Sequence, residues 1–174
     1  MDPKRFRDSI LREFPYSPTQ GQEELIRLLA SFIISSDHRF PFFLLEGYAG
    51  TGKTTIVSAL VKALPVAGYQ SMLLAPTGRA AKVLSGYSGK PAFTIHKRLY
   101  RPNMDADGHV AFSLLPNMLK NTVFIVDEAS MIPDDRGSGD GTVFQSRDLL
   151  SDLINHVYTG TNCKLIYLSY RAAT

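Results

Sequence analysis

The sequence predicts an α/β fold in which helices flank a parallel sheet. Four short apolar runs, rich in Val, Ile, Leu, Phe and Tyr, alternate with helix-like stretches along the 174 residues. The runs lack regular polar alternation, which is typical of parallel strands buried on both faces. With 44% hydrophobic residues, the chain can bury one core but is short for two ordinary domains, so residues 1–174 are expected to form a single domain.

The expected elements follow one another in a regular order. Residues 1–17, in which charged and apolar residues alternate, predict an N-terminal arm or helix. Helices are then predicted over residues 21–36, 53–64, 78–86 and 146–160, and strands over residues 41–47, 71–76, 122–128 and 164–169. Strands separated by helices favour a parallel sheet with right-handed crossovers.

Two segments interrupt this alternation. Residues 101–118 hold an Asp107-Gly108 turn signal between possible strand residues, which predicts a surface hairpin. Residues 133–142 are acidic and rich in glycine, and they predict a mobile loop to which the sequence assigns no role.

Charge is distributed unevenly along the chain. The net charge is only +3, but residues 47–104 contain eight Lys and Arg side chains and no Asp or Glu. The remainder therefore carries a net charge of −5. This segregation is typical either of a surface for an anionic partner or of a solvated basic helix face.

Composition excludes several classes of protein. The single Cys163 rules out an internal disulfide and a cysteine-based metal site. The apolar stretches are far shorter than the roughly 20 residues of a membrane helix, and the charged N-terminus is unlike a secretory signal. We therefore expect no membrane association and a cytoplasmic location.

A glycine-rich stretch follows the first predicted strand. GYAGTGKTT fits the pattern G-x-x-x-x-G-K-[ST] with Gly47, Gly52, Lys53 and Thr54. Glycines at this spacing let backbone N–H groups wrap an oligophosphate, and the following helix points its N-terminal dipole at the same anion. Lys53 would contact the β- and γ-phosphates, and the Thr54 hydroxyl would bind Mg²⁺.

The whole loop is expected to contact the nucleotide. Its residues are Gly47, Tyr48, Ala49, Gly50, Thr51, Gly52, Lys53, Thr54 and Thr55. The alternative is a glycine-rich turn that only joins a strand to a helix.

Two carboxylates, Asp127 and Glu128, follow the third predicted strand. Ligands of open parallel sheets lie at the carboxyl ends of the strands, so Asp127 would lie beside the loop if the first and third predicted strands are neighbours. Asp127 would then hold Mg²⁺, while Glu128 and Lys53 would be the catalytic residues, with Glu128 deprotonating the attacking water. Alone, this pattern is also typical of a strand that ends in solvated acids. Together with the loop, it predicts hydrolysis of a nucleoside triphosphate.

Thr19 and Gln22 precede a periodic apolar run. Their spacing indicates a capping box, with Thr19 at the N-cap and Gln22 at the third helical position. In the functional alternative, the Gln22 amide reads the edge of an adenine. Spacing alone favours the cap.

Cations and aromatic residues are interleaved in the acid-free region. They are Arg79, Lys82, Lys90, Lys97, Arg98 and Arg101 with Tyr87, Phe93, His96 and Tyr100. Such a mixture suits a single-stranded nucleic acid, and Thr77 and Gly78 at a strand-to-helix turn offer a hydroxyl and N–H groups to a phosphate. Taken singly, the aromatic residues are better explained as core.

The order of these segments resembles a known family. TQGQEEL, GYAGTGKTT, LLAPTGRAAKVLS, TIHKRLY and VFIVDEASM resemble the RecD-like helicases of superfamily 1, including their Pif-type relatives, from about Pro18 to Met131. The resemblance implies a RecA-like P-loop NTPase domain, the first motor domain, which uses ATP and Mg²⁺ and tracks 5′ to 3′ along single-stranded DNA. It further implies that Gln22 reads adenine and that DNA contacts come from Pro76, Thr77, Gly78, Arg79, Thr94 and His96.

The sequence departs from the family after the fourth predicted strand. Where the family has a Gly-Asp-x-x-Gln-type segment whose glutamine senses the γ-phosphate, this chain has Ser169, Tyr170 and Ala173. We also expect the second motor domain, with its arginine fingers, to be missing from this chain. Since a P-loop site without an arginine finger can lose roughly 10³–10⁵ in rate, slow ATP hydrolysis and no unwinding by this chain alone are expected. The alternatives are a nucleotide-gated single-strand-binding module without motor activity and an unrelated P-loop ATPase.

Overall fold

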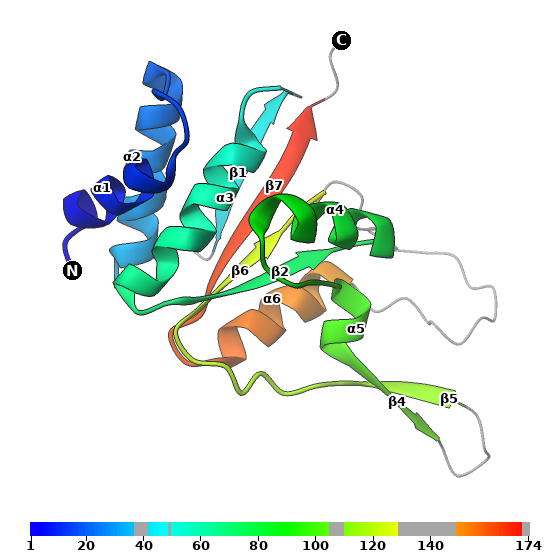
Figure 1. The fold of residues 1–174 in the computed structure, drawn as a ribbon. Helices are drawn as coiled ribbons and strands as arrows, with labels where there is room; N and C mark the ends of the chain where they lie inside the picture. Colours follow the sequence, from blue (N-terminus) through cyan, green and yellow to red (C-terminus); the bar gives the residue numbers. More distant parts are fainter. Residues whose placement is uncertain (37–41, 49, 105–109, 129–148, 172–174) are drawn as a thin grey trace.

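A five-stranded parallel sheet forms the centre of the fold (Figure 1). The computed structural model describes residues 1–36, 42–48, 50–104, 110–128 and 149–171. The predicted Asp107-Gly108 turn and the predicted loop at 133–142 lie outside these ranges. The strands are β1 (Phe43–Tyr48), β2 (Gln70–Ala75), β3 (Ala92–Thr94), β6 (Thr122–Val126) and β7 (Lys164–Arg171), in the spatial order β1-β7-β6-β2-β3.

Helices cover both faces of this sheet. One face packs against α1 (Pro3–Glu13), α2 (Gln20–Ile34), α3 (Lys53–Ala63) and α4 (Gly78–Ser88), and the other packs against α5 (Ile95–Leu99) and α6 (Leu149–Thr159). A short 3₁₀ helix, η1 (Leu64–Ala67), follows α3 directly. The predicted α/β fold with a parallel sheet is thereby confirmed, while β3, α5 and η1 are additions that the sequence pattern did not reveal.

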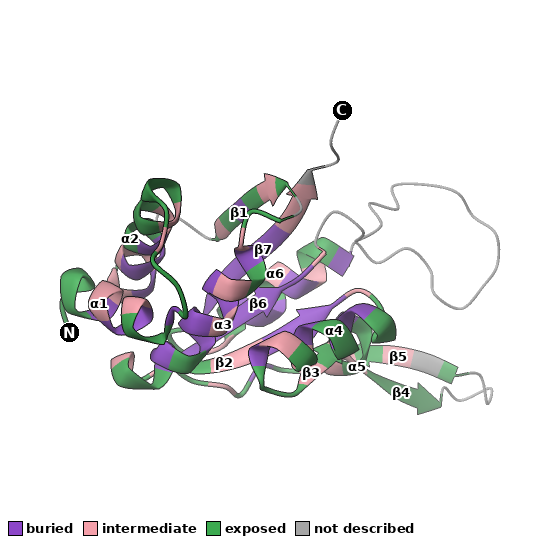
Figure 2. Cartoon of the chain, turned by 45° about the horizontal axis from the view of Figure 1, so that its top comes forward, coloured by how far each residue is buried: buried purple, intermediate pink, exposed green. Residues whose placement is uncertain are grey.

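The strands divide their side chains between the two layers. In β6, Val123 and Ile125 join the core under α1, α2 and α3, whereas Phe124 and Val126 join the core under α6. All five residues of β6 are buried, as Figure 2 shows for the middle of the sheet. This division follows from the two-residue period of a strand.

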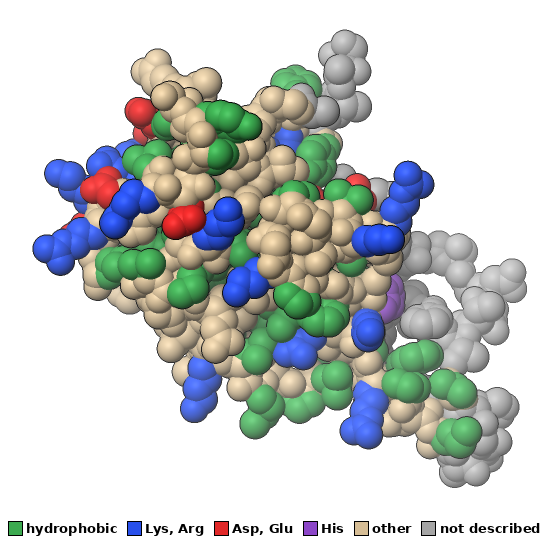
Figure 3. All heavy atoms as spheres, in the orientation of Figure 1, with side chains coloured by type: hydrophobic (Ala, Val, Ile, Leu, Met, Phe, Trp, Pro, Cys, Tyr) green, Lys and Arg blue, Asp and Glu red, His purple; other side chains and the backbone are tan. Residues whose placement is uncertain are grey.

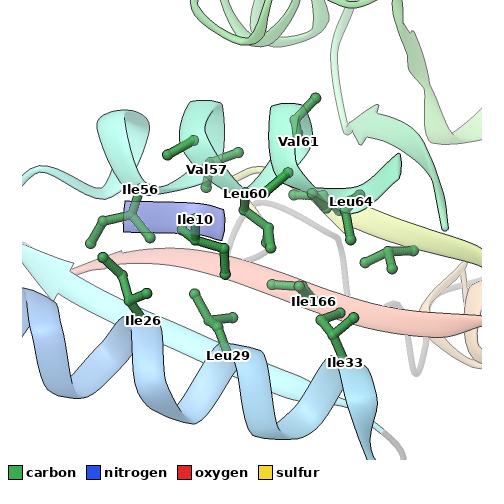
Figure 4. Close-up of a cluster of buried hydrophobic side chains, with 14 of the residues drawn as sticks. Ile10, Ile26, Leu29, Ile33, Ile56, Val57, Leu60, Val61, Leu64 and Ile166 are labelled. Carbon is green, nitrogen blue, oxygen red and sulfur yellow. The ribbon is translucent and has the colours of Figure 1, made fainter. Parts of the chain in front are cut away.

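The larger core depends on helical periodicity. Ile26, Leu29 and Ile33 recur at the spacing that places them on one face of α2. Figure 4 shows them pointing toward side chains of α3 such as Leu60, in the cluster that also holds Ile10 of α1. Residues 3–13 are thus an integral helix of the core and do not form a separate arm.

The position of the first predicted strand differs from what the sequence pattern indicates. The first predicted strand was expected to be buried on both faces, but β1 lies at an edge among the described strands and Leu44 is 50% exposed. The condition under which Asp127 was placed beside the loop, that the first and third predicted strands are neighbours, is not met, because β7 pairs with β1 on one side and with β6 on the other. A crossover that skips one position leaves no mark in the local sequence.

Strand β7 is also longer than predicted. It continues through Ser169 and Tyr170 to Arg171, because these residues pair with Glu46, Gly47 and Tyr48 of β1. The residues at which the chain departs from the family pattern therefore begin inside the sheet, next to the loop that follows β1.

The predicted surface hairpin is confirmed. Strands β4 (Tyr100–Met104) and β5 (Val110–Leu114) pair antiparallel, and they extend from the side of the molecule away from α1 and α2 (Figure 1). Two contacts join the base of this hairpin to α6. The Tyr100 hydroxyl donates to Asp152 Oδ2 at 2.6 Å, and His156 Nδ1 lies 2.9 Å from the Leu115 carbonyl oxygen. Within the described ranges, no helix combines the length and apolar composition that a membrane crossing requires.

The first testable feature is the docking of α1. Phe6 of α1 is fully buried in the larger core. Phe6→Ala should therefore lower the free energy of unfolding by about 3–5 kcal/mol, the usual cost of such a truncation. Urea unfolding followed by circular dichroism measures this. Leu28→Ala, at a position of α2 that is 42% exposed, is the control and should change stability far less. Equal effects of the two substitutions would show that α1 contributes little.

A second prediction concerns acid stability. His156 is buried, and burial lowers its pKa below the usual 6.5, with the charge of Arg98 acting in the same direction and the Leu115 hydrogen bond opposing it. Below about pH 6.5 the unfolded chain therefore takes up a proton that the folded chain resists, and the free energy of unfolding falls. Urea titrations at pH 7.5 and 5.5 measure the free energy of unfolding. Between these two pH values it should fall less for His156→Gln than for the native chain.

The exposed His96 provides the matched control for this experiment. His96→Gln should keep the full pH dependence of the native chain. The account of His156 fails if His156→Gln loses as much stability between the two pH values as the native chain does.

Candidate active site

The loop between β1 and α3 has a backbone that requires glycine. Gly50 and Gly52 have φ values of +80° and +84°, in the left-handed region. At Gly52 a Cβ would also lie 2.5 Å from Gln22 Nε2, so a side chain there is strained at this φ and also requires the Gln22 side chain to move. Of the predicted loop residues, Ala49 lies outside the described ranges.

The Lys53 ammonium lies inside this loop. Lys53 is only 4% exposed, and its Nζ donates to the carbonyl oxygens of Gly47 and, at 2.6 Å, Tyr48. The Tyr170 ring of β7 lies against it, with 4.3 Å between Nζ and the ring centroid, a distance at which a cation and an aromatic face attract each other. Burial lowers the pKa of Lys53, and the Asp127 carboxylate opposes this shift. A positive charge is thus held between two backbone carbonyl oxygens and an aromatic ring.

Asp127 is buried at the carboxyl end of β6. Its Oδ2 accepts a hydrogen bond from the Tyr87 hydroxyl at 2.9 Å, and its Oδ1 accepts one from the Glu128 N–H at 2.9 Å. Although β7 separates β1 from β6, all three strands end at the same edge of the sheet, so Asp127 still acts on Lys53 electrostatically. The structure therefore brings Lys53 and Asp127 within electrostatic reach of each other although β1 and β6 do not pair directly.

Glu128 follows with an unusual backbone. Its φ of +54° places a residue other than glycine in the left-handed region, an uncommon conformation that often occurs at functional sites. The Glu128 side chain is partly exposed, whereas Asp127 is buried. The two adjacent carboxylates thus differ in their access to water.

Two tyrosines belong to this cluster, and the sequence interpretation gave neither a role there. Burial raises the pKa of Tyr87 far above its ordinary value and that of Tyr170 to about 12, with the Asp127 carboxylate adding to both shifts. Both phenols are therefore neutral at physiological pH. Tyr170 was noted only as a departure from the family pattern, and Tyr87 lies 40 positions from Asp127, so no local pattern connects them.

Gln22 makes the predicted cap and also contacts the loop. Its N–H donates to Thr19 Oγ1 at 3.3 Å while its Oε1 accepts from the Thr19 N–H at 3.0 Å, which completes the capping box. Its Nε2 donates to the Thr51 carbonyl oxygen at 3.2 Å. Adenine recognition by Gln22 stays a prediction, since both amide atoms have protein partners in this conformation.

The donor set at this edge fits a magnesium nucleotide. Thr54 is the second residue of α3 and is exposed, and Thr55 beside it is partly exposed. A threonine hydroxyl and a carboxylate such as Asp127 are the oxygen ligands that Mg²⁺ prefers, with phosphates and waters completing its shell. The backbone of the loop and the Lys53 ammonium suit an oligophosphate.

The predicted DNA-contacting residues lie along the same edge of the sheet. Pro76, Thr77, Gly78 and Arg79 lead from β2 into α4, and Thr94 and His96 lead from β3 into α5. Ala75 pairs with Thr94 in the sheet, so the two segments are adjacent. Both threonines already act as N-caps: Thr77 accepts from the Ala80 N–H and Thr94 from the Lys97 N–H.

The cations of the acid-free region do not form one uniform surface. Lys53 is buried in the loop, and Arg98 is partly buried, whereas Arg79, Lys82 and Lys97 are exposed. Figure 3 shows Lys and Arg side chains over α4 and toward the hairpin, while most acidic side chains visible in this view lie near α1 and α2. Basic side chains also lie among the acidic ones around α1 and α2, so the acid-free surface is limited to α4 and the neighbouring hairpin side.

Comparison with known proteins assigns the family. A family described as an AAA domain matches residues 19–137, more than half of the chain. The chain belongs to this AAA domain family. Its likeness to the first motor domain of RecD-like helicases of superfamily 1 is confirmed by this match and by curated relatives.

Three of these relatives are helicases by name. The AAA domain is 36% identical over 116 residues to the ATP-dependent DNA helicase dda of Enterobacteria phage T4, covering 65% of this chain and 26% of that protein. It is 35% identical over 91 residues to the ATP-dependent RecD2 DNA helicase of Deinococcus radiodurans, a match that covers 52% of this chain and 12% of that protein. It is 36% identical over 74 residues to the ATP-dependent DNA helicase RecG of Acidithiobacillus ferridurans, a match that covers 42% of this chain and 10% of that protein. The matched region spans about a quarter or less of each relative.

The glycine requirement of the loop can be tested directly. Gly52→Ala should lower the free energy of unfolding by about 1–3 kcal/mol, because alanine is strained at this φ and its Cβ meets the Gln22 amide. Gly21→Ala is the control, since a Cβ there meets nothing within 4 Å in the first turn of α2. We expect that control to be neutral or slightly stabilising in urea unfolding. A Gly52→Ala protein as stable as Gly21→Ala would contradict the loop geometry.

Proposed function

We propose that residues 1–174 form a single RecA-like ATPase domain, the first motor domain of an ATP-dependent DNA helicase. The observation that carries this proposal is the buried Lys53 ammonium at the centre of a glycine loop, within electrostatic reach of the Asp127 carboxylate. A cation held by carbonyl oxygens at the start of a helix is well placed to exchange those partners for phosphate oxygens. The family match supports the same reading.

Nucleotide binding would use the loop from Gly47 to Thr55. Its backbone N–H groups would surround the phosphates, and Lys53 would turn from the carbonyl oxygens of Gly47 and Tyr48 toward the β- and γ-phosphates. Gln22 would exchange its contact with Thr51 for the edge of the adenine. The relatives' names, which describe ATP-dependent enzymes, support ATP as the nucleotide.

Hydrolysis would depend on oxygen ligands and a base at the sheet edge. Thr54 and Asp127 would hold Mg²⁺, which when bound neutralises charge on the phosphates. Glu128 would orient the attacking water and accept its proton, for which its partly exposed carboxylate is better placed than the buried Asp127. Lys53 and Glu128 are thus the proposed catalytic residues.

Single-stranded DNA is the proposed partner, with 5′ to 3′ movement. Pro76, Thr77, Gly78 and Arg79 together with Thr94 and His96 would contact the strand, and the adjacency of Ala75 and Thr94 supports one continuous path. A second motor domain, on the same or another chain, would add arginine fingers. Without it, turnover by these residues should be slow, and they should not unwind a duplex. A cytoplasmic location stays a prediction.

A second candidate is a nucleotide-gated strand-binding module without motor activity. The observation that favours it is Tyr170, which stands where the family has an acidic residue and lies against Lys53. In that case nucleotide would change the affinity for DNA without being turned over.

Lys53→Ala tests the assignment. The substitution removes the only side-chain ammonium that lies in the loop as described, so Mg²⁺-dependent phosphate release should fall by at least about 100-fold, the usual cost of losing one charge-stabilising donor. Lys62→Ala, at the exposed end of the same helix, is the control and should keep the native rate. Turnover by Lys53→Ala at the native rate would exclude the proposed site.

The same assay, run with and without oligo-dT, separates the two candidates. A motor domain should release phosphate and do so faster with the strand, whereas a binding module should bind oligo-dT in a nucleotide-dependent way without turnover. An unrelated ATPase should release phosphate and not bind the strand. Binding to oligo-dT should weaken steeply with salt if phosphates are the main contacts.

A further inference from the structure

Tyr87 contacts the active site from an element that the proposed reaction does not use. It lies near the end of α4, and its hydroxyl donates to Asp127 Oδ2 at 2.9 Å. We propose that Tyr87 is a positioning residue that fixes the Asp127 carboxylate for Mg²⁺ and connects the metal site to α4. This inference rests on the proposed function, because it assigns Tyr87 a role in the same site.

The surroundings of Asp127 show what the hydroxyl can do. Asp127 is 4% exposed, and among the described residues its Oδ2 accepts a hydrogen bond from the Tyr87 hydroxyl, its Oδ1 accepts one from the Glu128 N–H, and the Tyr170 phenol also interacts with the carboxylate. Two donors on opposite oxygens fix the rotation of the carboxylate. These donors leave an acceptor position for a metal or a metal-bound water, because a carboxylate offers about four such positions. Partners of this kind orient the ligands of metal sites.

The hydroxyl itself is held in place by a well-defined helix. α4 begins at the N-cap Thr77 and ends at Gly89, whose φ of +69° suits a glycine C-cap. One turn before Tyr87, Leu84 is fully buried, and the Ser88 hydroxyl donates back to the Leu84 carbonyl oxygen at 2.6 Å. The Tyr87 ring packs against the main core. The position of the hydroxyl therefore follows the position of α4.

The same helix starts at the proposed DNA contacts. Gly78 and Arg79 form its first turn, and α4 packs against α3, β2 and β3. A bound DNA strand that displaces α4 would change the distance between Tyr87 and Asp127, because this one helix carries both the proposed DNA contacts and Tyr87. Tyr87 would thus let strand binding alter the affinity of the site for magnesium nucleotide.

Binding of fluorescently labelled ADP to the 174-residue chain, titrated with Mg²⁺, tests this role without requiring turnover. Tyr87→Phe removes only the hydroxyl and keeps the ring that packs in the core. We expect the Mg²⁺ concentration that half-maximally strengthens ADP binding to rise about 10-fold in Tyr87→Phe, as for other residues that orient a metal ligand. ADP binding in EDTA should stay at the native value.

The matched control is Tyr69→Phe. The Tyr69 hydroxyl also donates across the fold, to Asn162 Oδ1 at 3.2 Å, but at an exposed position outside the cluster around Lys53. Its Mg²⁺ dependence should equal that of the native chain. The proposal is overturned if Tyr87→Phe shows the native Mg²⁺ dependence, or if it loses ADP binding in EDTA as well, since the latter indicates a purely structural role.

Failure of the proposed function has a different signature in the same experiment. If the native chain binds no labelled ADP, the nucleotide site itself is wrong and the role of Tyr87 falls with it. If the native chain binds ADP with Mg²⁺ and Tyr87→Phe has the same Mg²⁺ dependence, the nucleotide site is supported and the inference on Tyr87 is overturned.

A second titration, with oligo-dT present, tests the connection through α4. The strand should change the affinity of the native chain for Mg²⁺ and ADP by about 5-fold or more, the lower range of coupling between sites. In Tyr87→Phe, oligo-dT should leave the affinity for Mg²⁺ and ADP nearly unchanged. In Tyr69→Phe, oligo-dT should change this affinity as much as in the native chain. Equal factors in the native chain and Tyr87→Phe would overturn the connection to DNA.

Discussion

The candidate active site is organised around one buried positive charge. The Lys53 ammonium is nearly inaccessible to water, and a buried charge is costly unless polar groups surround it. The carbonyl oxygens of Gly47 and Tyr48, the ring of Tyr170 and the Asp127 carboxylate together provide that environment. The loop turns back on itself to place these groups around the ammonium, and Gly50 and Gly52 adopt left-handed φ values within that turn. The same arrangement leaves a cation ready for an anionic ligand.

The parallel sheet makes this arrangement possible. Every strand of a parallel sheet ends at the same edge, so groups that are distant along the chain meet there without pairing directly. Lys53 follows β1, Tyr170 lies in β7 and Asp127 follows β6. The candidate strand-contacting segments after β2 and β3 continue along that edge. One edge of the sheet therefore carries both the proposed ATP site and the proposed DNA path.

Local patterns in the sequence were enough to predict some parts of the molecule. The glycine loop, the Thr19 capping box and the hairpin each depend on residues close together in the chain, and each is present. The order of the strands was not predictable, because the insertion of β7 between β1 and β6 depends on long-range packing. The same holds for the bond between Tyr87 and Asp127. The sequence identifies chemical groups, while their partners across the sheet require the fold.

A crystal structure of the chain with ADP and Mg²⁺ tests the central claim most directly. The account predicts that Lys53 Nζ leaves the carbonyl oxygens of Gly47 and Tyr48 and comes within hydrogen-bonding distance of a β-phosphate oxygen. Mg²⁺ should then bind the Thr54 hydroxyl, with Asp127 as a direct ligand or through a bound water. A nucleotide bound elsewhere, or a loop that holds the nucleotide while Lys53 stays on the two carbonyl oxygens, would contradict it.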